Sequence, residues 1–302
     1  MVNSVGGIMV FLLVTALAHA QPYLQVLGIA QDGGYPHIGC EQACCAPARQ
    51  DHTLREPVVS LALVDPASKL WWLFEATPDI NDQLHAFHAT HPEYSYLPAG
   101  ILITHAHIGH YAGLMQLGRE ALGSKDVPVY VMERMANFLT NHGPWSQLVT
   151  LHNISLRVIT SESLSLAPGI DVRAFTVPHR DEFSETAGFR ITTSTKKYLF
   201  IPDIDKWEKW PVKVEDLVKE VDYALLDATF NTASELPNRS MSEIPHPLVT
   251  ETVARLERWP ELKQRVYFIH LNHTNPLLWN TAEQASLTKK GFNIARTGMI
   301  LR

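Results

Sequence analysis

The sequence predicts an α/β or α+β fold built from layered β-sheets and helices. Short apolar runs rich in β-branched residues, which are typical of strands, recur along the chain. Amphipathic stretches typical of helices lie between and after these runs. The sequence has no internal repeat, no low-complexity tract and no Gly/Ser-rich linker, so residues 21–302 are expected to form one continuous domain.

Each expected element follows from its own pattern. Strands are predicted where mostly apolar residues run together, at 23–29, 58–64, 71–74, 100–104, 127–132, 156–160, 170–177, 188–194 and 197–201. Amphipathic patterns predict helices at 79–90, 109–122 and 133–141. A late β-α-β passage combines strands at 223–228 and 265–270 with a helix at 248–257. The chain is expected to end in a helix over 276–290 and one or two strands.

The first twenty residues differ from the rest of the chain. Residues 8–18 are apolar apart from Thr15, and this run is too short to span a bilayer. Small residues at Ala18 and Ala20 then form an A-x-A cleavage site. We predict a signal peptide over 1–20, cleavage after Ala20, and a periplasmic or secreted protein with no stable membrane insertion. No Lys or Arg precedes the apolar run, so an uncleaved amino-terminal anchor is the alternative.

Three histidines lie within six residues of the stretch THAHIGH, at the predicted carboxyl end of strand 100–104. His105 and His107 are two residues apart, so they point the same way in an extended segment. His110 begins the next predicted helix and can turn back toward them. Three imidazoles that converge at such a loop suit a divalent transition metal, so the sequence predicts a metal site here.

The stretch THAHIGH resembles the H-x-H-x-D-H signature of the metallo-β-lactamase superfamily, with Gly109 in place of the aspartate. Further motifs follow in the family's order: Asp79 after an early strand, then His179, Asp203 and His270 at later strand ends. The stretches GIAQDGGYPHIGCEQACC, ATPDI, LLDATF and FIHLNHTNPLL resemble the pyrroloquinoline-quinone biosynthesis protein B-like group. This resemblance implies a four-layer αββα sandwich of two mixed sheets flanked by helices, with metals at one edge of the sheets.

The resemblance also implies how the ligands are shared between two metals. His105, His107 and His179 would bind the first metal, and His110 and His270 the second, while Asp203 would bridge both. Gly109 offers no ligand, so the second site loses a negative charge. We predict a strong first site and a weaker or empty second one. After one metal is stripped, the surviving site should depend on His179 more than on His110.

The chemistry implied is metal-assisted hydrolysis by a metal-activated water. Asp203 would hold that water, and Asp79 is the other acidic candidate for a catalytic role. His246 is the candidate that protonates the leaving group, because relatives place a histidine at the start of a late helix near the metals. The alternative for His246 is an ordinary surface histidine at a helix start.

The cysteines Cys40, Cys44 and Cys45 lie within six residues. Some relatives carry a cysteine run here that joins a late histidine in a structural zinc site, which implies a closed Cys3His site with His273. The spacing differs from that of the relatives, and His37 is a second candidate for the fourth ligand. The alternative is a disulfide from Cys40 to Cys44 or Cys45, which an oxidising compartment would favour.

Composition limits the partners. The net charge is −6, and the sequence has no stripe of basic residues. Both observations argue against nucleic acid as the main partner. The glycine-rich loop QDGGYPH is expected near the metal groove, but it lacks the Lys-Ser/Thr of a P-loop and does not predict a nucleotide site. The expected partner is a small-molecule substrate.

Three functions are consistent with these patterns. The first is an exported metal-dependent hydrolase of an ester, lactone, amide or phosphodiester, with one or two Zn²⁺ in the active site and one structural Zn²⁺. The second is an iron-dependent oxidase or oxygenase, because histidine sites with open positions also accept iron. The third is a non-catalytic zinc-binding protein. Metal identity separates the first two, and turnover of a chromogenic ester or phosphodiester separates the first from the third.

Overall fold

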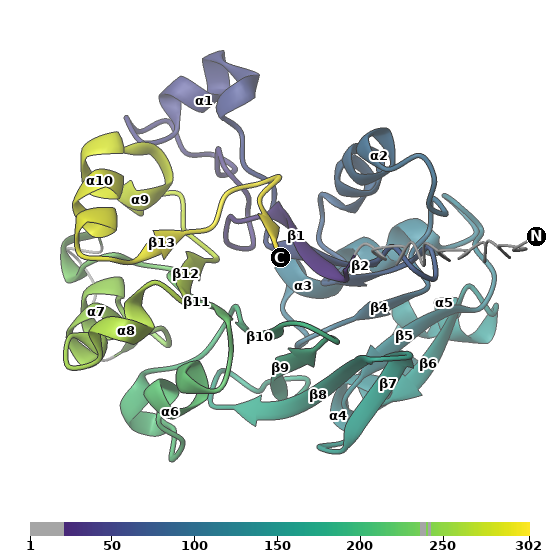
Figure 1. Ribbon diagram of the computed structural model, residues 1–302. Helices are drawn as coiled ribbons and strands as arrows, with labels where there is room; N and C mark the ends of the chain where they lie inside the picture. The colour runs from purple at the N-terminus through teal and green to yellow at the C-terminus, as the bar shows by residue number, and fades with distance from the viewer. Residues whose placement is uncertain (1–20, 236–239, 241–242) are drawn as a thin grey trace, which may run out of the picture.

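The computed structural model describes residues 21–235, 240 and 243–302, so the predicted signal peptide lies outside the described residues. Two seven-stranded mixed sheets form the centre of the molecule (Figure 1). In spatial order, the first sheet holds β14 (Ile300–Leu301), β1 (Tyr23–Gly28), β2 (Ser60–Asp65), β3 (Leu70–Phe74), β4 (Gly100–Leu102), β5 (Val127–Val131) and β6 (Ile154–Val158). The second holds β13 (Asn293–Ile294), β12 (Val266–Ile269), β11 (Tyr223–Asp227), β10 (Lys197–Ile201), β9 (Thr186–Thr192), β8 (Ile170–Val177) and β7 (Ser163–Ala167).

Helices cover the outer faces of both sheets. The helices on the side of the first sheet are α2 (Ile80–Thr90), α3 (Ile108–Tyr111), α4 (Glu133–Asn141) and α5 (Trp145–Thr150). Those on the side of the second sheet are α6 (Val214–Lys219), α7 (Val249–Leu256), α8 (Pro260–Lys263), α9 (Pro276–Trp279) and α10 (Thr281–Lys289). This arrangement confirms the predicted αββα sandwich. Within the described residues, no helix is long and apolar enough to cross a membrane.

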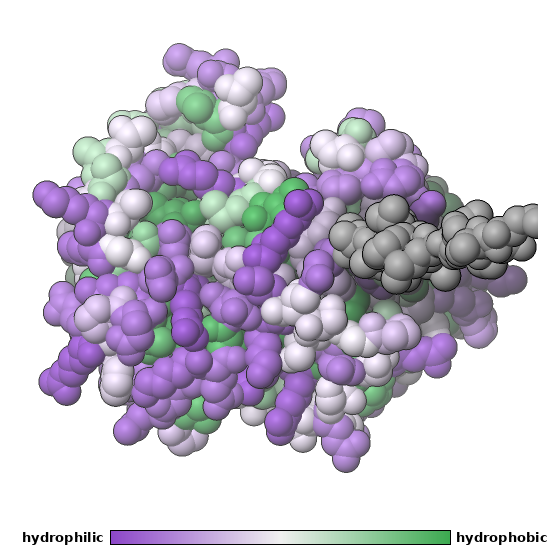
Figure 2. All heavy atoms as spheres, in the orientation of Figure 1, coloured by the Kyte–Doolittle hydropathy of each residue, from purple (hydrophilic) through white to green (hydrophobic). Residues whose placement is uncertain are grey.

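Strand β3 illustrates why some strands of the first sheet are apolar without interruption in the sequence. In β3, Trp72 and Phe74 face the core between the two sheets, whereas Trp71 and Leu73 face the helices. Successive side chains of a strand point to opposite faces, and both faces are buried here. All four side chains are therefore almost fully buried. On the outside of the molecule, hydrophilic residues predominate on the face shown in Figure 2.

Two predicted helices differ in the structure. The helix expected over 109–122 is only α3 followed by a 3₁₀ helix, Ala112–Leu117. A Cβ built on Gly113 would lie 2.1 Å from the carbonyl oxygen of Thr77, so this segment is fitted against the chain that follows β3. The helix expected over 276–290 breaks at Asn280, whose side chain accepts a hydrogen bond from the N–H of Ala282 and caps α10.

Among the α-helices and strands of the described residues, five short ones were not predicted: α1 (Ala46–Gln50), α5, α6, α8 and β7. None exceeds six residues, which is too short for a periodic pattern to stand out. Helix α1 extends outward from the rest of the molecule, close to the predicted cysteine cluster in sequence (Figure 1).

Strand direction brings the candidate site together. Strands β3, β4, β5 and β6 are parallel to one another, as are β10, β11, β12 and β13. Strand β8 runs antiparallel to β9, which runs antiparallel to β10, so β8 and β10 share a direction. Carboxyl ends of parallel strands meet at one edge of a sheet, where ligand sites commonly form. The histidines and carboxylates described next follow these strand ends.

Candidate metal centre

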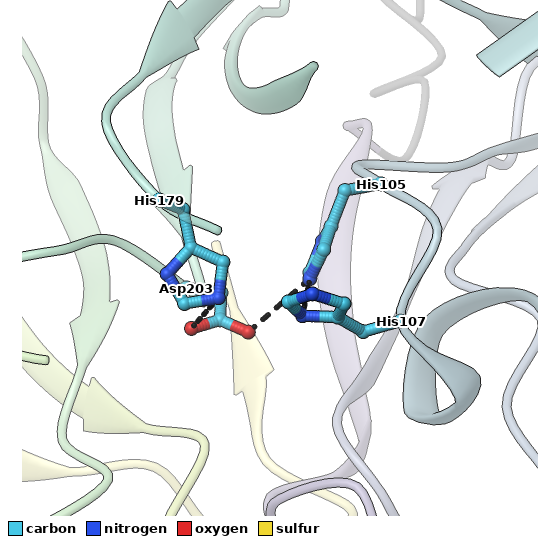
Figure 3. A group of neighbouring side chains, drawn as sticks. All are labelled: His105, His107, His179 and Asp203. Atoms are coloured by element: carbon cyan, nitrogen blue, oxygen red, sulfur yellow. Dashed lines mark hydrogen bonds and ion pairs between the residues drawn. The ribbon is translucent and has the colours of Figure 1, made fainter. Parts of the chain in front are cut away.

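Four side chains that follow β4, β8 and β10 form the first group of candidate ligands: His105, His107, His179 and Asp203. Their ligand atoms all lie within 4.8 Å of one another. The Asp203 carboxylate lies between the imidazoles, with Oδ2 3.3 Å from His105 Nε2 and Oδ1 3.3 Å from His179 Nε2 (Figure 3). His107 joins from the same loop, with its Nδ1 2.8 Å from His105 Nε2.

A second group lies on the other side of Asp203. The ligand atoms of Asp32, His110 and His270 also lie within 4.8 Å of one another. Oδ2 of Asp203 is 3.5 Å from His110 Nε2 and 3.9 Å from His270 Nε2. Asp203 therefore contacts histidines of both groups, the position that a bridging carboxylate needs. The structure thus brings together all six histidine and aspartate side chains that the sequence predicts as ligands of the two active-site metals.

Several buried polar atoms of this cluster lack hydrogen-bond partners among the described residues. They are Nδ1 and Nε2 of His110 and of His179, Nε2 of His270, and Oδ1 of Asp32 and of Asp203. Each such atom costs about 1–3 kcal/mol when it stays unpaired in the interior, so a folded protein rarely keeps this many. Imidazole nitrogens and carboxylate oxygens are ligands that zinc prefers. The residues present therefore fit one or two metal ions.

The protonation states of His105, His179 and Asp203 in the first group suit metal binding. Burial lowers the pKa of His179 to about 4 and the pKa of His105 well below its usual range. Burial alone would raise the pKa of Asp203, but the surrounding histidines, His179 first, hold it well below its usual range. Neutral imidazoles and an ionised carboxylate are the forms that ligate metals.

Side chains behind the candidate ligands orient them. Thr104 Oγ1 lies 2.9 Å from His105 Nδ1, and Thr229 Oγ1 lies 2.9 Å from His270 Nδ1, so both rings present Nε2 to the centre. Glu75 is fully buried, and its Oε1 lies 3.4 Å from His110 Nδ1, an ion-pair contact rather than a hydrogen bond. Such partners fix ring orientation and tautomer in metal sites.

His246 lies at the edge of the centre, just before α7. Its Nδ1 is 2.9 Å from Asp227 Oδ2 and 3.1 Å from Asp203 Oδ1, and the ligand atoms of these three residues and His270 lie within 4.8 Å of one another. Burial opposes charging of this ring, but Asp227 and Asp203 more than offset that effect and raise the pKa of His246 to about 10. His246 is 6% exposed, so the interpretation as a surface histidine is wrong.

The structure corrects the choice of Asp79. Its carboxylate accepts a hydrogen bond from the N–H of Val58 at 2.8 Å, and Asp79 precedes α2 as its N-cap residue. Among the described residues, it belongs to none of the groups that could hold a metal. The acidic residue of this motif that reaches the centre is Glu75, beside His110. The turn into α2 carries Asp79 away from the strand end.

Asp32, Glu75 and Asp227 were not among the predicted site residues. Glu75 and Asp227 each close a buried strand, and a systematic search for acidic residues at strand ends would have found them. Asp32 lies in the glycine-rich loop QDGGYPH, which was expected near the groove only as a wall of the pocket.

The three cysteines form a separate, largely buried cluster and are free in the structure. Their sulfur atoms lie within 4.8 Å of one another, with Cys40 Sγ 3.7 Å from Cys44 Sγ. A tetrahedral zinc with Zn–S bonds of about 2.3 Å separates two sulfurs by about 3.8 Å, close to this distance. The predicted fourth ligand, His273, instead stacks on His37, with ring centroids 4.4 Å apart. Neither histidine belongs to the sulfur group among the described residues.

Comparisons with known proteins agree with this fold. The chain is 26% identical to coenzyme PQQ synthesis protein B of Methylobacterium sp. (strain 4-46), over 91% of this chain and 98% of that protein. The zinc-bound PqqB structure of Methylobacterium extorquens superposes with a TM-score of 0.76 at 22% identity, covering 93% of this chain and 99% of that one.

Two further solved structures share the fold. A diphosphatase of the PhnP family superposes with a TM-score of 0.68 at 22% identity, covering 93% of this chain and 97% of that one. Human tRNase Z, short form, does so with a TM-score of 0.56 at 17% identity, covering 93% and 98%. The model of the β-lactamase superfamily domain matches residues 70–271, more than half of the chain. The chain therefore belongs to the metallo-β-lactamase superfamily and is PqqB-like.

Proposed function

We propose that the protein is a metal-dependent hydrolase that acts on an ester, lactone, amide or phosphodiester of a small molecule. The observation that carries this proposal is the set of buried, unpartnered imidazole and carboxylate atoms around Asp203. A diphosphatase and a tRNase Z with this fold support hydrolysis as the reaction class. When bound, zinc would lower the pKa of water toward neutrality and polarise the scissile bond.

The chain's own residues would have three tasks in this reaction. His105, His107 and His179 would hold one metal, and burial keeps the rings of His105 and His179 neutral. Asp203 lies between the two histidine groups, so its carboxylate would orient the nucleophile and balance the positive charge of bound metals. Thr104 fixes the His105 ring from behind through its hydroxyl group.

Leaving-group protonation falls to His246. Its Nδ1 is held by Asp227 at 2.9 Å, which leaves Nε2 as the nitrogen free to transfer a proton. We expect His246→Gln to slow hydrolysis of an alkyl phosphodiester or alkyl ester by about 10²–10⁴-fold, the usual contribution of a general acid. Hydrolysis of the p-nitrophenyl analogue should fall much less, because p-nitrophenolate leaves without a proton.

The matched control for this variant is His152→Gln, since His152 is an exposed histidine outside the cluster. Metal content should stay at the wild-type value in both variants. Equal losses on the two kinds of leaving group would contradict the assignment, and a lost metal would show that His246 is a ligand instead.

The reaction class is tested by turnover of bis(p-nitrophenyl) phosphate and p-nitrophenyl esters by the purified protein, together with its metal content. Hydrolysis that a chelator abolishes and zinc restores is the expected result. Iron as the bound metal, with no hydrolysis, would favour the oxidase or oxygenase instead. Bound zinc without turnover of any substrate would favour a non-catalytic zinc-binding protein.

We propose that the cysteine cluster holds a structural zinc. Burial raises the pKa of the Cys45 thiol to about 12, so a thiolate there needs a bound cation. Cys44→Ser should therefore remove one zinc per chain and lower the melting temperature, while hydrolysis by the folded fraction stays near wild type. Mass analysis of the wild-type protein under non-reducing conditions checks the alternative, because a disulfide lowers the mass by two hydrogens and excludes this zinc.

We also propose export with cleavage after Ala20, on the basis of the apolar run over 8–18 and the A-x-A site. The mass of the protein recovered from the periplasm or medium tests this. A chain that begins at Gln21 is expected, and a full-length, membrane-bound chain would show an uncleaved anchor instead.

A further inference from the structure

Gly109 occupies the position where the superfamily signature has an aspartate, and Asp32 occupies the space beside it. A Cβ built on Gly109 would lie 2.1 Å from Oδ1 of Asp32 and 2.6 Å from its Cα. Both distances are far below van der Waals contact, so a side chain at 109 and the present position of Asp32 exclude each other. Gly109 and Asp32 are thus a complementary pair from two loops far apart in sequence.

The backbone holds Asp32 at this place. Asp32 lies in a tight turn after β1, in which the N–H of Gly34 donates to the carbonyl oxygen of Gln31 at 2.8 Å. The N–H of Gln31 in turn donates to the carbonyl oxygen of Leu271 at 2.9 Å. Leu271 directly follows His270, so the turn is attached to the segment that carries a candidate ligand.

The carboxylate of Asp32 has one oxygen engaged and one free. Its Oδ2 accepts a hydrogen bond from Gln31 Nε2 at 3.2 Å. Its Oδ1 is buried, has no hydrogen-bond partner among the described residues, and lies 3.4 Å from His110 Nε2. A free oxygen beside two imidazoles is the arrangement of a metal ligand rather than that of a structural hydrogen bond.

We propose that Asp32 supplies the carboxylate of the second metal site, in place of the side chain that Gly109 lacks. His110 and His270 complete the site, and Asp203 is shared with the first metal. The second site then keeps the negative charge that the signature aspartate would have provided. This inference rests on the metal centre of the proposed function, but it does not depend on the reaction.

The isosteric variant Asp32→Asn tests the proposal, with zinc per chain measured by mass spectrometry and zinc affinity measured by competition with a chromogenic chelator. We expect one zinc fewer per chain than in the wild type. The affinity of the second site should fall by more than about 100-fold, because even residues behind the ligands contribute 10–100-fold. The matched control is Asp82→Asn, an exposed aspartate on α2, which should retain the wild-type zinc content.

Gly109→Ala gives an independent test, because its Cβ must displace the Asp32 carboxylate. It should cause the same loss of one zinc, and the double variant should lose no more than either single variant. Wild-type zinc content and affinity in Asp32→Asn would overturn the proposal. Loss of one zinc in Asp32→Asn, in a protein whose wild type hydrolyses nothing, would contradict only the proposed reaction. Hydrolysis by a wild type whose metal content does not depend on Asp32 would contradict only this inference.

Discussion

Asp203→Asn is expected to abolish hydrolysis and to release the metals of both histidine groups. Oδ1 and Oδ2 of Asp203 lie 3.1–3.9 Å from nitrogens of His105, His110, His179, His246 and His270. No other described carboxylate contacts histidines of both groups. A metal contributes several kcal/mol to transition-state stabilisation, which corresponds to a rate loss of about a thousandfold or more.

The change is checked by steady-state rates on a p-nitrophenyl substrate and by metal content of the same samples. Asp216→Asn serves as the control, because Asp216 is an exposed aspartate on α6 that belongs to none of the groups of candidate ligands. The control should keep both the rate and the metals. A variant at Asp203 that keeps its metals and a tenth or more of the rate would show that this carboxylate does not bridge the centre.

Removal of all metals is expected to destabilise the fold strongly. The unpartnered nitrogens and oxygens of the cluster, and the three buried thiols, would then lack the ions that satisfy them. A ligand at about a thousand times its Kd stabilises a protein by about 4 kcal/mol. At roughly 2–4 °C per kcal/mol for a domain near this size, the melting temperature should fall by on the order of 10 °C.

Differential scanning calorimetry of the wild type and Cys44→Ser, each with and without a chelator, measures this effect. Added zinc should restore the melting temperature, and magnesium should not, since it prefers oxygen ligands. The difference between the two proteins in the fall of the melting temperature gives the part of the stabilisation that comes from the thiolate site. An unchanged melting temperature in chelator would contradict the presence of stabilising metals at both clusters.

The fold and the main ligands were predictable because they depend on local patterns. Strands with two buried faces, such as β3, appear in the sequence as uninterrupted apolar runs. Ligands such as His105, His179 and His270 follow such runs directly, so strand ends alone indicate where they meet. Their role as metal ligands remains a prediction that the metal measurements will test.

The predictions from the sequence were wrong where tertiary contacts determine the local structure. The helix pattern over 109–122 continued through Gly113, although that residue lies against the chain after β3 and the segment is fitted to it. In the motif LFEATPDI, both Glu75 and Asp79 are acidic, and only the turn into α2 shows which of them faces the histidines. Local composition carries no information about that turn.

Gly109 shows the same limit most clearly. From the sequence, a glycine in the signature meant a lost ligand and a weaker second site. The structure places Asp32 beside it, although the two residues lie in loops joined to different strands. No pattern of spacing pairs these loops, because the turn that carries Asp32 is placed by backbone contacts of Ala30 and Gln31 with Leu271, far along the chain.

The most direct test of the metal centre is the number and identity of metals bound to purified residues 21–302, measured by mass spectrometry without added metal. We expect three zinc ions per chain: two at the histidine–carboxylate centre and one at the thiolates. Asp203→Asn should retain only the thiolate zinc. A wild-type protein that binds no metal, even after zinc is supplied, would contradict the proposed metal centre, because the buried imidazoles and carboxylates would then have another purpose.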